Sequence, residues 1–184
     1  MTALTTHLVG PDRRLTSGGL NRLRAGVLGA NDGIVSVAAI VVGVAGASTS
    51  RTAIVTAGVA GLVAGALSMA AGEYVSVGSQ RDAERAAHVP AAEQTNPWHA
   101  AVASFASFVA GGVVPLLVAL LPWAHSAVVL AVFVGVLLAL LVTGLVSATV
   151  SGAGRRRSVV RNLVGGSVAM AVTYGVGTLV GLAL

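Results

Sequence analysis

The chain has 184 residues, of which 55% are hydrophobic and 9% are charged, and its mean hydropathy is +0.90. Ordinary soluble domains carry about a quarter charged residues, so the six acids and eleven bases of this chain are too few to cover a soluble surface. The composition therefore predicts a membrane protein. The chain holds no cysteine, which excludes disulfides, thiolate metal sites and cysteine nucleophiles.

Five apolar blocks follow one another along the chain, and each is long enough for the roughly 20 residues of a membrane-spanning helix. Short polar, Pro-containing or Gly-containing segments separate them. A polar N-terminal tail, residues 1–23, is expected to precede a transmembrane domain over residues 24–184, which has one short loop at 81–97. The predicted fold class is an all-α membrane protein with five transmembrane helices. These helices are expected at residues 24–47, 52–80, 98–121, 126–150 and 159–184.

The arginines predict how the helices are oriented in the membrane. All eleven bases are arginine, and ten of them fall on alternate connections between the predicted helices, with Arg51 as the exception. The positive-inside rule then places the N-terminus in the cytoplasm and the C-terminus outside. Arginines at membrane boundaries favour contact with anionic lipid over nucleic acid. The ten are Arg13, Arg14, Arg22, Arg24, Arg81, Arg85, Arg155, Arg156, Arg157 and Arg161.

Two acids lie inside the apolar blocks, Asp32 in the first and Glu73 in the second. A charged group at the centre of a membrane helix costs at least about 2.5 to 3.5 kcal/mol, so such groups usually face the bundle interior or a water-filled path. Asp32 follows Arg24 by eight residues, and Glu73 precedes Arg81 by eight. At about 1.5 Å of rise per residue, both carboxylates are expected on one level, inside the same boundary.

Met69 lies one helical turn before Glu73, so the thioether and the carboxylate share a helix face. Two carboxylates and one soft sulfur suit a first-row transition metal better than Mg²⁺ or Ca²⁺, which favour oxygen ligands. Two alternatives stay open: ordinary core packing for the thioether, and a structural hydrogen-bonded pair for the acids. Three further residues could add oxygens or hold water, namely Asn31, Ser36 and Ser68.

Two stretches of sequence strongly resemble the vacuolar iron transporter family. They are LRAGVLGANDGIVSVAAIVVGVAGA (residues 23–47) and AGLVAGALSMAAGEYVSVGSQRDAE (residues 60–84). The resemblance implies a five-helix homodimer that exchanges cytoplasmic Fe²⁺, or a related divalent metal, for protons. It also implies that the metal path includes Asp32, Met69 and Glu73.

The segment between the second and third helices departs from that family. Typical members insert a long cytoplasmic helical segment there, rich in Glu and Met, whereas this chain has only residues 80–97. It therefore resembles the short, nodulin-like members. The acids and histidines that remain in this loop match no defined metal motif, so we expect a solvated loop.

The function expected from the sequence is export of Fe²⁺ or Mn²⁺ from the cytoplasm by proton antiport. No enzyme motif, cofactor fingerprint or nucleic-acid partner is expected; the partners are divalent metal ions, protons, the lipid bilayer and a second copy of the chain. The expected location is a bacterial inner (plasma) membrane, or an organelle membrane in a eukaryote. Two alternatives remain: a membrane scaffold or partner subunit whose buried acids are structural, and a small proton-coupled drug exporter.

Overall fold

The computed structural model describes residues 17–152 and 154–183, which form five α-helices and no strand. All five helices are long and apolar enough to cross a membrane. The predicted fold class, an all-α membrane protein with five spanning helices, is confirmed. The helices are α1 (Ser17–Ala47), α2 (Arg51–Ala86), α3 (Pro97–Leu120), α4 (His125–Ser151) and α5 (Arg155–Ala183).

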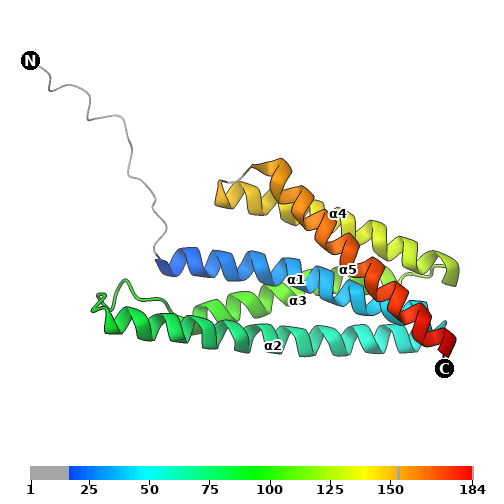
Figure 1. The fold of residues 1–184 in the computed structure, drawn as a ribbon, viewed down its shortest axis with the longest axis horizontal. Helices are drawn as coiled ribbons and strands as arrows, with labels where there is room; N and C mark the ends of the chain where they lie inside the picture. Colours follow the sequence, from blue (N-terminus) through cyan, green and yellow to red (C-terminus); the bar gives the residue numbers. More distant parts are fainter. Residues whose placement is uncertain (1–16, 153, 184) are drawn as a thin grey trace, which may run out of the picture.

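The first two helices are longer than the sequence suggested. Of the predicted tail, residues 1–16 lie outside the described residues, and the rest is already helical, because α1 begins at Ser17. α2 runs past the expected end near Gln80 for another turn and a half, and Gln80 accepts a hydrogen bond from Asn21 of α1 at 2.9 Å. With 36 residues, α2 is about 54 Å long, more than the roughly 30 Å hydrocarbon core. Its end projects beyond α4 and α5 in Figure 1.

α1 is the central helix of the bundle. It packs against all four other helices, whereas α2 contacts only α1 and α3 among the described residues. Figure 1 shows α2 and α3 on one side of α1 and α4 and α5 on the other. The start of α1 and the C-terminus lie at opposite ends of the bundle, as an odd number of spans requires.

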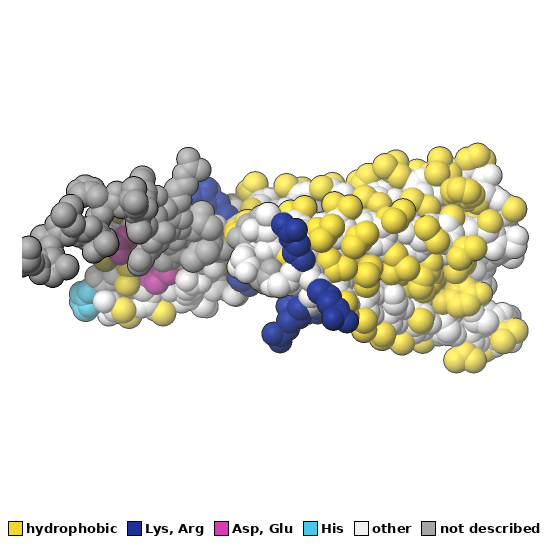
Figure 2. All heavy atoms as spheres, turned by 90° about the horizontal axis from the view of Figure 1, so that it is seen from above, with side chains coloured by type: hydrophobic (Ala, Val, Ile, Leu, Met, Phe, Trp, Pro, Cys, Tyr) yellow, Lys and Arg dark blue, Asp and Glu magenta, His cyan; other side chains and the backbone are white. Residues whose placement is uncertain are grey.

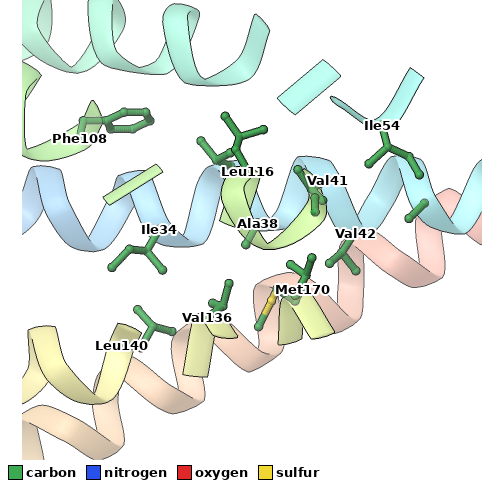
Figure 3. Close-up of a cluster of buried hydrophobic side chains, with 14 of the residues drawn as sticks. Ile34, Ala38, Val41, Val42, Ile54, Phe108, Leu116, Val136, Leu140 and Met170 are labelled. Atoms are coloured by element: carbon green, nitrogen blue, oxygen red, sulfur yellow. The ribbon is translucent and has the colours of Figure 1, made fainter. Parts of the chain in front are cut away.

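A continuous apolar core surrounds α1 and holds the five helices together (Figure 3). Such packing of side chains against one another is what associates helices in a membrane, since lipid tails are as apolar as the core itself. The residues labelled in the close-up are Ile34, Ala38, Val41, Val42, Ile54, Phe108, Leu116, Val136, Leu140 and Met170.

Glycines let α1 approach its neighbours closely. A Cβ on Gly33 would collide with the carbonyl oxygen of Phe108 in α3, and a Cβ on Gly177 of α5 would collide with the carbonyl oxygen of Gly43 in α1. Small residues at helix interfaces commonly permit this kind of contact. These glycines therefore serve packing between helices of one chain.

Arginine side chains gather at one end of the apolar surface, and acidic and histidine side chains lie beyond them (Figure 2). Arg51, the exception to the arginine pattern, is at the other end, where its guanidinium donates to the carbonyl oxygens of Leu120 and, at 3.1 Å, Leu121. A cation at the C-terminal end of a helix satisfies carbonyls that have no partner within the helix. Arg51 thus completes the end of α3.

Candidate metal site within the membrane span

A cavity of about 530 Å³ lies between α1 and α2, with Phe108 of α3 forming part of its wall. Its polar lining comes from the residues that the sequence singled out. Of the six predicted site residues, five line this cavity: Asp32, Ser36, Ser68, Met69 and Glu73. The helix periodicity that placed the thioether of Met69 and the carboxylate of Glu73 on one face therefore brings both to one space.

Asp32 contributes a half-buried carboxylate from the middle of α1. The hydroxyl of Ser36, one turn later, donates to its Oδ1 at 2.7 Å. A carboxylate offers about four lone-pair sites, so one hydroxyl donor leaves most of this capacity for a proton or a cation. The hydrogen bond from Ser36 also fixes the direction of the Asp32 side chain.

Glu73 is the most buried charged residue of the cavity, with its side chain only 6% exposed. Nη2 of Arg24 in α1 lies 3.0 Å from Glu73 Oε2 and donates a hydrogen bond to it. Removing one partner of a buried ion pair leaves an uncompensated charge and is strongly destabilising. The pair therefore joins α1 to α2, a contact that sequence reasoning missed because it treated Arg24 only as a boundary marker.

The two carboxylates line the same cavity from antiparallel helices. Asn21 of α1 donates to Gln80 of α2, and Gly61 faces Ile40, so Asp32 is level with the part of α2 near Met69, about one turn from Glu73. Arg24 reaches Glu73 through its long side chain. That both acids lie at one depth in the membrane stays a prediction.

Met69 and Asn31 complete the set. Met69 lies on α2 one turn before Glu73; it lines the cavity and also packs against the apolar core. Asn31 lines a different cavity, between α1, α4 and α5. Consecutive residues of a helix point about 100° apart, so Asn31 and Asp32 face different sides of α1.

Acids outside the span are held by polar contacts of their own. Glu84 accepts hydrogen bonds from the backbone N–H of Thr95 at 2.7 Å and from Gln80 at 3.0 Å, and Asp82 pairs with Arg85 at 3.5 Å. Among the described residues, no three His, Asp or Glu side chains gather as a metal-binding group. One chain therefore brings two carboxylates and one thioether to its cavity.

A five-helix bundle with buried acids around a cavity inside its span is an integral membrane protein of the kind that handles ions. The model of the VIT family matches residues 23–89 and 86–178 of the chain, which therefore belongs to this family. This confirms the resemblance seen in the sequence. The family is one of transporters; it is not a family of enzymes, and it implies no resident cofactor.

Similar proteins from two plants cover most of the chain. Vacuolar iron transporter homolog 1 of Oryza sativa subsp. japonica is 50% identical over 175 residues, which is 87% of this chain and 74% of that protein. Vacuolar iron transporter homolog 2 of Arabidopsis thaliana is 44% identical over 166 residues, which is 87% of this chain and 85% of that protein.

Proposed function

We propose that this protein moves a divalent transition metal, Fe²⁺ or Mn²⁺, out of the cytoplasm in exchange for protons. The observation that carries the proposal is the cavity inside the membrane span that Asp32, Met69 and Glu73 line together. The names of the plant relatives support iron as the cargo. The metal is a substrate that enters and leaves, and it is not a permanent part of the protein.

The donor set of the cavity favours transition metals. Carboxylate and hydroxyl oxygens bind Fe²⁺ and Mn²⁺ as well as Mg²⁺ and Ca²⁺, but the thioether of Met69 is a soft ligand that the last two do not use. A single sulfur among oxygens therefore gives the site a preference without closing it to Mn²⁺.

Proton coupling follows from two acids in an apolar setting. A carboxylate oxygen can bind either a proton or a metal cation, and a bound cation opposes protonation. Metal and proton thus compete for Asp32 and Glu73. A proton gradient across the membrane can then drive release of the metal on one side and its binding on the other.

Arg24 takes part in this exchange as a built-in cation. In the structure its guanidinium neutralises Glu73, so a metal that binds Glu73 must displace it. The Arg24 side chain is 52% exposed, whereas the Glu73 side chain is 6% exposed. The Arg24 side chain can therefore move away from Glu73 while the Glu73 carboxylate stays in the cavity.

The arginine-rich end of the bundle is proposed to face the cytoplasm, which follows the positive-inside rule and makes the direction of transport outward. The relatives are plant proteins whose names say vacuolar, and these names lend no support to the bacterial inner membrane expected from the sequence. In either membrane, the proposed direction is out of the cytoplasm.

A homodimer would complete the site. α2 contacts only α1 and α3 among the described residues, and its cavity face carries exposed small residues such as Ala64, Ser68 and Gly72. Small residues allow close helix approach in membranes. A second copy across this face would enclose a space with four carboxylates and two thioethers, enough to replace the water around a metal ion.

The proposal is tested with purified protein in liposomes, by measuring Fe²⁺ and Mn²⁺ uptake with and without a pH gradient. Asp32→Asn and Glu73→Gln should each abolish uptake at equal protein abundance. Asp82→Asn is the matched control, because Asp82 is an exposed acid on the same helix as Glu73, outside the cavity. Uptake that ignores the pH gradient, or that survives both cavity variants, would overturn the proposal.

A structural role is the second candidate, and the Arg24–Glu73 ion pair favours it because it ties α1 to α2. In that case the protein is a membrane scaffold or partner subunit, and wild-type liposomes take up no metal. Its variants would then lose thermal stability or association with other subunits.

A further inference from the structure

A second and larger cavity, of about 890 Å³, lies on the other side of α1, between α1, α4 and α5. It faces another side of α1 than the acidic cavity, although Leu28 borders both cavities and Arg24, which lines this one, pairs with Glu73 of the other. Arginine and amide side chains, serine and threonine hydroxyls and a few apolar residues line it together. Its volume falls in the range of sites that hold small organic groups.

The charge of this cavity is positive. Arg24 and Arg161 line it, and none of the described residues in its lining is acidic. Because Arg24 pairs with Glu73, the positive charge that is left for a ligand comes from Arg161. Arg161 forms no ion pair with a described acid, and three more arginines, residues 155–157, are exposed at the start of the same helix. The cavity therefore attracts an anion, and a guanidinium group matches phosphate geometry with paired N–H donors.

Two polar side chains inside the cavity lack partners within the described residues. The Oδ1 atom of Asn31 is buried and accepts no hydrogen bond, and the side chain of Ser147, which is 9% exposed, has no hydrogen-bond partner of its own. A polar group inside a membrane is stabilised by a hydrogen-bond partner. A ligand oxygen in the cavity can accept a hydrogen bond from the Ser147 hydroxyl.

We propose that this cavity binds the phosphate-ester group of an anionic phospholipid headgroup. Arg24 and Arg161 line the site, arginines gather at one end of the apolar surface (Figure 2), and basic pockets between membrane helices are suited to lipid headgroups. Leu23 and Val27 give the same cavity an apolar wall, against which the glycerol backbone and the start of an acyl chain can pack. A soluble phosphate ester shares the charge but not this apolar part.

The test measures lipid binding to the full-length protein by native mass spectrometry, with phosphatidylglycerol and phosphatidylcholine as paired probes. Wild type should prefer phosphatidylglycerol by at least about tenfold, and Arg161→Gln should weaken that binding by about tenfold, or about 1.4 kcal/mol. Arg156→Gln is the control, because it removes the same charge from the same helix but does not line the cavity. It should change binding by less than about twofold.

Two further arms keep the result decisive. Ser147→Val fills the inner wall and should weaken binding without any change of charge. Glycerol 1-phosphate, the soluble probe, should bind far more weakly than the lipid. Equal losses for Arg161→Gln and Arg156→Gln would show only general attraction to the basic surface and overturn the site. Equal affinity for glycerol 1-phosphate would overturn the lipid as its ligand.

Discussion

Two cavities flank the central helix, and their chemistry is opposite. The cavity towards α2 holds two acids and a thioether, whereas the cavity towards α4 and α5 holds two arginines with amides and hydroxyls. Neighbouring residues of α1, Asn31 and Asp32, belong to different cavities. Polar residues that are adjacent in a membrane helix therefore need not form one site, since each successive residue turns by about 100°.

Substituting each of these two neighbours separately should give the largest difference in transport. Asp32→Asn removes the charge that both metal and proton need, and transport should fall by at least about a hundredfold, or about 2.7 kcal/mol. Asn31→Ala removes an amide that faces the other cavity, and transport should change by less than about threefold. Radioactive iron or manganese uptake into liposomes measures both. Equal loss in the two variants would mean that the cavities work as one path.

The Arg24–Glu73 pair should show a large coupling in stability. Arg24→Gln leaves the Glu73 carboxylate buried without its partner and should destabilise the protein by about 3 kcal/mol. The double variant Arg24→Gln/Glu73→Gln should lose much less than the sum of the two single losses, because no charge is left unpaired. Thermal unfolding in detergent measures each variant.

The surface pair Asp82–Arg85 is the control for this cycle. It spans 3.5 Å with side chains 77% and 56% exposed, and exposed pairs contribute about 0 to 1 kcal/mol. Its double-mutant cycle should be nearly additive. Additive losses at Arg24 and Glu73 as well would contradict an ion pair inside the membrane layer.

The sequence predicted the class of the site better than its geometry. Hydrophobic blocks and turns located all five helices, and the rarity of acids in apolar blocks identified Asp32 and Glu73. Polar residues at the ends of α1 and α2 continue both helices past the boundaries predicted from polarity, so such a boundary is a poor origin for pairing residues across the two helices. Counting from the connection would have done better: Arg24 precedes Thr49 by 25 residues and Glu73 follows it by 24, which makes them neighbours in an antiparallel pair.

Other structural features depend on how the helices pack against one another, which no local sequence pattern predicts. Nothing near Arg51 in the sequence shows that its guanidinium completes the end of α3, about 70 residues later. The pairing of Gly43 with Gly177 also needs the position of α5 beside α1. Small residues allow close packing of membrane helices, but their positions in the sequence do not show which helices pair.

Met69 distinguishes the acidic cavity from the basic cavity, because it supplies a soft donor that the basic cavity lacks. Met69→Leu keeps the apolar volume that packs against the core and removes the sulfur. Uptake of Fe²⁺ and Co²⁺ should then fall more than uptake of Mn²⁺, which accepts oxygen ligands well. The ratio between metals should shift by roughly tenfold, or about 1.4 kcal/mol. An equal fall for all metals would indicate damage to packing.

The smallest effect is expected in the loop between α2 and α3, which tests whether metal is gathered outside the two cavities. His88 and Glu93 are exposed there, and neither takes part in the contacts that hold Glu84 to Thr95. His88→Asn suits the position, because its φ of 58° is left-handed and Asn tolerates that region. Combined with Glu93→Gln, it should change the apparent metal affinity by less than about twofold. If titration calorimetry showed that this variant has lost several tight metal sites, the loop would concentrate metal. The acidic cavity would then be the second metal-binding site on the transport path rather than the first.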